Sequence, residues 1–197
     1  AEEKRERERQ RQEREAALRL KNNKLGVTIF QGSWIMVFVA LIIVNWQMRY
    51  SPEWLKPGYS TPDATLPSVA TALLLASAWS ARSALRAVKA DQVAQFLSQW
   101  RTATVLGGAF FLIMLSQLFA LPPEAGQITS VFRVMIGYHA AHAIAIAFMM
   151  VQVMRYAQAR PKHYNANNHW AVEATVRLWY FVVVAWIMFY VVLYWIP

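Results

Sequence analysis

Five long apolar stretches dominate the 197-residue sequence and restrict what it can fold into. They lie at residues 27–48, 66–85, 104–121, 131–154 and 170–195. Because a helix rises about 1.5 Å per residue, each stretch can cross a hydrocarbon core of roughly 30 Å. Hydrophobic residues make up 57% of the chain, more than a soluble domain of this size ordinarily carries. The sequence therefore predicts an all-α integral membrane protein, a bundle of five transmembrane helices.

The first 24 residues differ sharply from the rest, because they are densely charged and have almost no apolar residue before Ala16. Oppositely charged pairs four residues apart, such as Glu3–Arg7 and Lys4–Glu8, favour a solvated helix. No apolar heptad indicates a coiled coil. We expect residues 1–24 to form a charged, helical cytoplasmic tail and residues 25–197 to form the transmembrane domain. Two roles stay open for the tail: it fixes topology, or it docks a partner subunit.

The basic residues are distributed unevenly among the expected loops. With the amino terminus inside, the outer loops contain only Arg49 and Lys56 as basic residues. The inner loops contain Arg82, Arg86, Lys89, Arg101, Arg155, Arg160 and Lys162. Since cytoplasmic loops are enriched in Lys and Arg, we expect a cytoplasmic amino terminus and an external carboxyl terminus. The net charge of +9 is then mainly a topology signal, and no nucleic-acid partner is expected.

Two spans are rich in small residues. The second span is rich in Ala and Ser, and the fourth has Gly137, Ala141 and Ala145 at four-residue spacing. Small residues let helix backbones approach closely in a membrane. We therefore expect both spans to pack against neighbouring helices.

Two histidines, His139 and His142, lie inside the fourth span, three residues apart on one face. Such a pair could bind a metal, but no Asp, Glu or Cys in that segment completes a site, and the chain has no cysteine at all. Haem with two axial histidines usually takes them from facing helices, and no other span offers one. We expect packing histidines, with a metal or haem role as the alternative.

Four further polar residues lie near or within the spans. Glu173 begins the last span, with Arg177 four residues on, which predicts a mutually neutralising pair; a role in a proton path is the alternative. Arg133 can reach headgroups or a partner carboxylate, and Gln117 is expected to hydrogen-bond across helices. No catalytic, cofactor-binding or metal-binding residue is predicted. The predicted lipid-binding or structural polar residues are His139, His142, Glu173, Arg177, Gln117 and Arg133.

The pattern of these spans resembles subunit III of the haem–copper oxidases in its five-helix bacterial form. Residues 132–143, FRVMIGYHAAHA, are similar to the family's aromatic-x-x-x-T-G-F-H-G-x-H-V signature. Residues 169–174, HWAVEA, and the WYFV run at 179–182 resemble the family's H-F-G-F-E-A and W-H-F-V motifs. Weaker similarities in the second and third spans extend the resemblance over nearly everything after Leu25.

The sequence departs from the family pattern at several acidic positions. Ser33 is followed by Trp34 where the family usually has Ser-Glu, and Val183 replaces an Asp. Tyr180 stands in place of a His, and only Gln117 remains of a Gln–Glu pair. These departures argue against a proton-buffering role for those positions in this chain.

The resemblance implies an accessory, non-redox subunit of a cytochrome c or quinol oxidase in the bacterial inner (plasma) membrane. Such a subunit binds no haem or copper, both of which are expected in partner subunits. It would pack beside oxidase subunit I, together with subunit II, and hold phospholipids in an interhelical cleft. Oxygen reduction, proton pumping and aerobic electron transport would belong to the complex, with no catalytic site in this chain. Two alternatives stay open: a five-helix companion of a nitric oxide reductase, and a haem-binding membrane anchor.

Overall fold

The structure is a computed structural model that describes residues 2–160 and 162–196. Its five long helices are α1 (Glu2–Met48), α2 (Thr65–Lys89), α3 (Val93–Ser116), α4 (Gln127–Ala159) and α5 (Trp170–Tyr190). Short helical turns follow α3 (η1, Gln117–Phe119), precede α4 (η2, Pro123–Ala125) and extend α5 as a π-helical turn (η3, Val191–Trp195). No strand forms within the described ranges. The predicted all-α fold is confirmed.

Four of the five helices are both long and apolar enough to cross a membrane: α1, α3 with η1, α4, and α5 with η3. The fifth, α2, has 25 residues, about 38 Å at a rise of about 1.5 Å per residue. It is less apolar because Ala and Ser replace larger side chains along it. Its length allows it to cross a bilayer, but that α2 does so stays a prediction.

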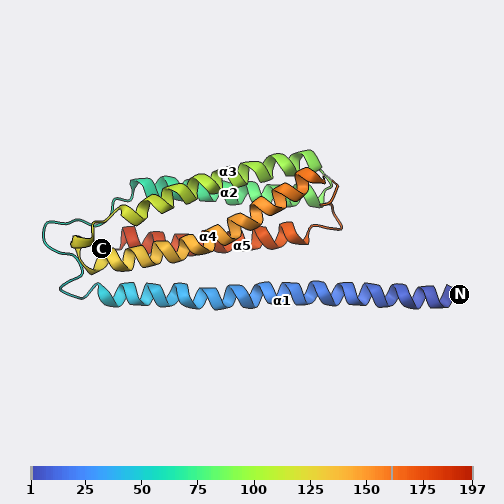
Figure 1. Ribbon diagram of the computed structural model, residues 1–197, viewed down its shortest axis with the longest axis horizontal. Coiled ribbons are helices and arrows are strands. Elements are labelled where there is room, and N and C mark those ends of the chain that lie inside the picture. The colour runs from blue at the N-terminus through green and yellow to red at the C-terminus, as the bar shows by residue number, and fades with distance from the viewer. Residues whose placement is uncertain (1, 161, 197) are drawn as a thin grey trace. The chain divides into compact units, whose positions relative to one another are not determined.

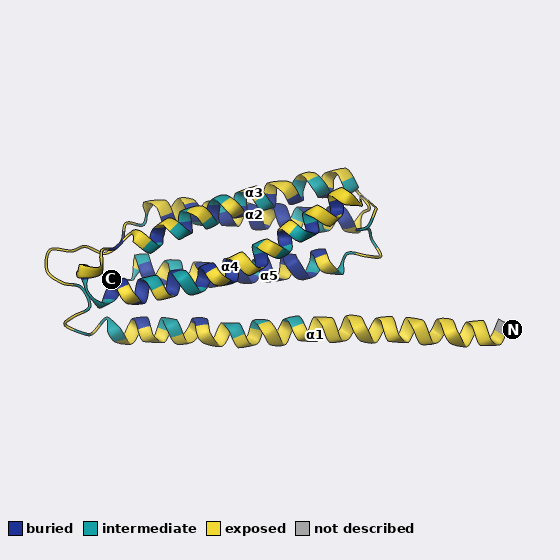
Figure 2. Cartoon of the chain, in the orientation of Figure 1, coloured by how far each residue is buried: buried dark blue, intermediate teal, exposed yellow. Residues whose placement is uncertain are grey.

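The chain divides into two compact units, residues 1–37 and residues 38–197, each described here by itself. In the first unit residues 3–24 of α1 are exposed, as the colouring of Figure 2 shows. Arg7 pairs with Glu3 at 2.6 Å, and Arg11 pairs with Glu15 at 3.2 Å. These are the four-residue spacings that favour a solvated helix. The predicted division of the chain after residue 24 stays a prediction.

In the second unit α2, α3, α4 and α5 form an antiparallel bundle (Figure 1). Helix α2 packs along α3, α3 against α4, and both α2 and α4 against α5, so the four helices close a ring. The loops at residues 49–64 and 120–126 lie at the same end as the last turn of α5, which we name the Arg49 end. The loops at residues 90–92 and 162–169 lie at the opposite end, which we name the Glu173 end.

The small residues of α2 are used as predicted, whereas those of α4 are not. Helix α2 buries Ala70, Ser77, Ala78, Ser80, Ala81, Ala84 and Ala87. In α4, by contrast, Ala141 and Ala145 are exposed and Gly137 is half-buried, with no atom within 4 Å of an added Cβ. Helix α4 packs instead through larger side chains such as Met135, Ile146 and Met150. The predicted packing of α4 against neighbouring helices is therefore confirmed, but within the described residues the small-residue stripe does not form the contact.

Helix α3 begins at Val93, earlier than the apolar stretch at 104–121 predicts. Its first turns have polar side chains on the outer face, but Phe96 and Trp100, four residues apart, are both 1% exposed. The Trp100 indole N–H donates to the carbonyl of Met150 on α4 at 2.9 Å. The bundle therefore continues beyond the most apolar part of α3.

The loop at residues 49–64 is attached to the start of α4. The amides of Gln127 and Ile128 donate to the carbonyls of Glu53 and Trp54, each at 3.0 Å. These contacts satisfy N–H groups that the first turn of a helix leaves without partners. Gly126 makes this close approach possible, because its φ is +124° and a Cβ there would lie 2.6 Å from the Trp54 carbonyl oxygen.

Candidate functional site

The six predicted polar residues lie at three levels of the bundle and do not form one site. His139 and His142 lie midway along α4. Glu173 and Arg177 lie in the first turns of α5, at the Glu173 end. Gln117 and Arg133 lie towards the Arg49 end, on η1 and on the second turn of α4.

His139 is fully enclosed by aromatic rings. Its side chain is 0% exposed, and the rings of Trp186, Phe38 and Phe110 have centroids 5.4, 6.0 and 6.1 Å from the imidazole. Neither ring nitrogen has a hydrogen-bond partner. Buried polar groups are normally paired, so this imidazole is held by ring contacts rather than by hydrogen bonds.

His142 lies one turn further along α4 and is satisfied locally. Its Nδ1 lies 2.7 Å from the carbonyl oxygen of Tyr138, four residues earlier. Because a carbonyl oxygen only accepts, Nδ1 carries the proton and donates it. The ring also packs against Phe38 and Tyr138, at centroid distances of 5.2 and 4.2 Å.

A metal or haem site was the alternative to a packing role for the two histidines. No group of three His, Cys, Asp or Glu side chains that could hold a metal ion occurs among the residues that the structure describes. The ring contacts of His139 and the backbone contact of His142 indicate packing roles.

Glu173 is part of an ion cluster at the Glu173 end. Its Oε2 lies 3.1 Å from Nζ of Lys89 and 3.4 Å from Nε2 of His169. Lys89 is on the last turn of α2 and Glu173 is on the first turn of α5, so their meeting follows from the antiparallel packing of these helices. Nearby, Asp91 accepts the backbone N–H of Ala166 at 2.8 Å, which ties the two loops of this end together.

The predicted pair of Glu173 with Arg177 stays a prediction, and sequence reasoning did not name Lys89 or His169 as partners of Glu173. Arg177 is exposed. The spacing of four residues between His169 and Glu173 was a readable signal for their contact. Lys89 carried no such signal, because its proximity depends on α2 and α5 being neighbours.

Gln117 and Arg133 form hydrogen bonds just beyond the end of α3. Gln117 is 5% exposed, and its Oε1 accepts the Tyr194 hydroxyl of the π-helical turn at 3.3 Å, which is the predicted bond between helices. Arg133 donates through Nε and Nη2 to the carbonyls of Leu118 and Leu121, both at 3.0 Å. Since the last carbonyls of a helical turn lack intrahelical partners, Arg133 acts as a side-chain cap for η1, the turn that follows α3.

Arg49, which sequence reasoning treated only as a loop charge, does the same for α5. Its guanidinium donates to the backbone carbonyls of Val192 and Ile196, and its Nε donates to Oδ1 of Asn45 at 2.9 Å. It also lies over the Trp54 ring, 5.6 Å from the centroid. Partial burial lowers the pKa of Arg49 from its ordinary value.

A ladder of hydrogen bonds joins α5 to α2. The indole of Trp186 donates to Thr71 Oγ1 at 2.8 Å, and that of Trp179 donates to Ser77 Oγ at 3.0 Å. Nearer the Arg49 end, the Tyr190 hydroxyl lies 2.7 Å from Ser68 Oγ. Hydroxyl and indole groups therefore bind one helix to the next, as polar groups often do within a bilayer.

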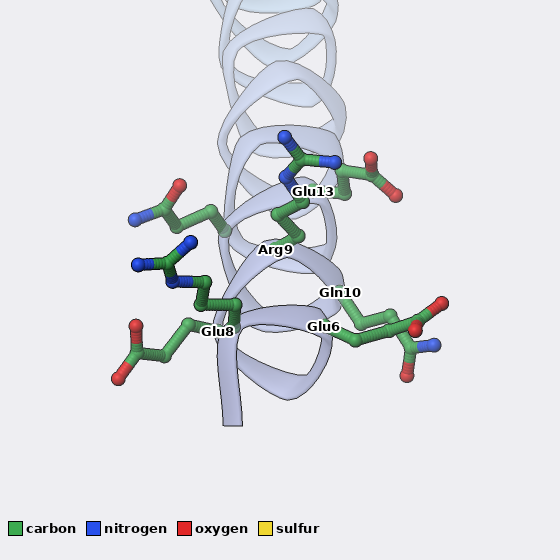
Figure 3. Close-up of a pocket in the computed structure, with 7 residues that line it drawn as sticks. Glu6, Glu8, Arg9, Gln10 and Glu13 are labelled. Atoms are coloured by element: carbon green, nitrogen blue, oxygen red, sulfur yellow. The ribbon is translucent and has the colours of Figure 1, made fainter. Parts of the chain in front are cut away.

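The charged stretch at residues 5–13 of α1 shows no enclosed site. Figure 3 shows its long side chains, including those of Glu6, Arg9 and Glu13, radiating from a single helix. A hollow between side chains of one exposed helix has no second wall to exclude water. Its charges are available to solvent.

Comparison with known proteins adds a family-level result. The sequence model of the family described as Cytochrome c oxidase subunit III matches residues 7–197. Cytochrome c oxidase subunit 3 of Thermostichus vulcanus is 29% identical over 175 residues, which cover 86% of this chain and 85% of the relative. The protein of the same name from Synechocystis sp. is 26% identical over 175 residues, with 86% and 73% covered. That of Oncorhynchus mykiss is 27% identical over 186 residues, with 89% and 70% covered.

Proposed function

The chain belongs to the cytochrome c oxidase subunit III family, the accessory subunits of haem–copper oxidases, and from that premise we propose how it serves its complex. It packs beside the catalytic subunit I, together with subunit II, and stabilises their assembly. Oxygen reduction and proton pumping take place in those partners. The observation that carries this proposal is the family match over residues 7–197, which includes all of α2, α3, α4 and α5.

The use of polar groups inside the bundle supports a non-redox role. The hydroxyl of Ser77 and the guanidinium of Arg133 are engaged in joining or capping helices. His139 packs against aromatic rings, and His142 donates to its own helix. Haem and copper are therefore assigned to partner subunits.

The charge distribution supports an orientation in the bacterial plasma membrane. Apart from Arg133, the basic residues of α2, α3 and α4 gather at the Glu173 end, with Arg86 and Lys89 in the last turn of α2. We place this end and the amino terminus on the cytoplasmic side and the carboxyl terminus outside. Phospholipids occupy grooves between the helices, where exposed apolar side chains such as Leu112 and Phe148 meet them.

Purification of the native complex through a tag on this chain tests the proposal. We expect a large haem–copper oxidase subunit to co-purify, and we expect the complex to consume oxygen with cytochrome c or quinol as donor. The chain expressed alone should show no Soret band. Recovery of a nitric oxide reductase as the only large partner, or a Soret band in the isolated chain, would overturn the assignment.

A further inference from the structure

A small hollow at the Arg49 end has the chemistry of a headgroup site. Its volume is about 140 Å³, and it is lined by Trp46, Arg49, Tyr50 and Ile196. Trp46 and Arg49 come from the end of α1 and the residue after it, and Ile196 follows the π-helical turn of α5. All four residues belong to the same compact unit.

The guanidinium of Arg49 has hydrogen-bonding capacity left over. An arginine side chain has five N–H donors. Three of them serve Asn45, Val192 and Ile196, which leaves two N–H groups of this lining residue for a ligand. No carboxylate of the described residues forms an ion pair with Arg49. The hollow is therefore lined by a cation with unused N–H hydrogen-bond donors.

The surroundings of Arg49 match the headgroup layer of a membrane. Arg49 directly follows α1, whose apolar part is long enough to span the bilayer. The side chains of Trp46 and Tyr50 are 49% and 76% exposed, and such rings favour the boundary between hydrocarbon and water. Beside the guanidinium, the amide nitrogen of Asn45 is buried without a hydrogen-bond partner.

We propose that this hollow binds the phosphate of a phospholipid headgroup, with the two remaining N–H groups of Arg49 donating to phosphate oxygens. Guanidinium and phosphate form strong, charge-assisted hydrogen bonds. The exposed rings of Trp46 and Tyr50 then cover the glycerol and the first methylenes of the lipid. Because two donors already serve the carbonyls at the end of α5 and a third serves Asn45, a bound phosphate completes the partners of Arg49 without breaking a contact. The inference deepens the proposed lipid-binding role and rests on it.

The test uses the purified complex, stripped of lipid in dodecyl maltoside and titrated with phosphatidylglycerol while bound lipid is counted by native mass spectrometry. Arg49→Gln should weaken the tightest lipid site by about tenfold or more, the scale of one lost charge-assisted hydrogen bond. Tyr50→Ala removes a wall of the hollow but leaves the guanidinium in place, and it should weaken lipid binding several-fold. Lys56→Gln is the matched control: it removes an exposed cation from the same loop, outside the hollow, and should leave binding unchanged.

Each remaining outcome decides the question. Equal lipid retention by the wild-type and Arg49→Gln complexes overturns the proposal. If the Arg49→Gln complex fails to assemble because α5 loses its cap, the Tyr50→Ala complex is used for the test instead. Unchanged lipid retention by the Tyr50→Ala complex overturns the proposal. Displacement of the lipid by equimolar inorganic phosphate would reassign the hollow to free phosphate. The oxidase assignment fails separately, when no large oxidase subunit co-purifies, whatever the lipid titration gives.

Discussion

Trp179 donates its indole N–H to the hydroxyl of Ser77 at 3.0 Å, and that hydroxyl donates onward to the carbonyl of Ala103 at 2.7 Å. Three helices, α5, α2 and α3, meet at this point. Ser77 and Trp179 are both buried, at 0% and 1% exposure. The contact is therefore dry, and its geometry depends on how closely α3 approaches the indole.

Gly107 sets that approach, so Gly107→Ala should destabilise the bundle. A Cβ at Gly107 would lie 2.7 Å from Cζ2 of Trp179 and 3.2 Å from the Ser77 hydroxyl. Because the ring is enclosed, the helices must separate, at a cost of about 1–3 kcal/mol. Thermal or SDS-induced unfolding of the purified complex measures the loss.

The next residue along α3 supplies the control for this substitution. No atom lies within 4 Å of a Cβ added to Gly108. Gly108→Ala should therefore be neutral or slightly stabilising, because Ala favours helix more than Gly does. Equal effects of the two substitutions would show that helix propensity, and not the approach to Trp179, determines the result.

His139→Ala should lower the stability or assembly of the complex more than its initial turnover. The substitution leaves a cavity among aromatic rings, which typically costs about 2–4 kcal/mol. His139→Leu keeps most of the volume and should cost less than about 1.5 kcal/mol, because neither imidazole nitrogen has a hydrogen bond to lose. Thermal denaturation and the initial rate of oxygen consumption separate these effects. Loss of turnover in a fully assembled His139→Leu complex would assign His139 a chemical role.

Local sequence patterns predicted the number and nature of the helices, because a bilayer imposes length and apolarity on each segment separately. They failed to predict contacts that depend on which helices are neighbours in the bundle. The pairing of Lys89 with Glu173 requires that α2 end beside the start of α5, and no spacing within either helix states that.

The same limit explains the small-residue stripe of α4. A run of small residues indicates that close packing is possible, but the described bundle leaves Ala141 and Ala145 exposed and packs α4 through larger side chains. Conversely, the four-residue spacing of Phe96 and Trp100, both buried, was a signal that the third helix begins earlier, near its observed start at Val93. Helical periodicity was a better signal there than mean apolarity.

The Lys89–Glu173 pair should contribute little to stability. Its side chains are 44% and 34% exposed, so water screens the attraction, and such pairs are typically worth about 1 kcal/mol or less. A double-mutant cycle with Lys89→Gln and Glu173→Gln measures the coupling, which should shrink at high salt. The control is a second cycle that combines Arg86→Gln with Glu173→Gln, since Arg86 lies in the same last turn of α2. A coupling well above about 2 kcal/mol would contradict this prediction.

Tyr164 should make the protein sensitive to alkaline pH. Burial, and secondarily Tyr156, raise the pKa of Tyr164 above its ordinary value of 10.0. Below pH 10 the phenol is protonated in both the folded and the unfolded chain; above it, only the unfolded chain releases the proton readily. Stability should therefore fall as pH rises from 10 through the folded pKa. In unfolding midpoints measured from about pH 9 upwards, Tyr164→Phe should flatten this fall, whereas Tyr59→Phe, at an exposed loop position, should not. Identical slopes for wild type and Tyr164→Phe would show that the buried phenol is not responsible.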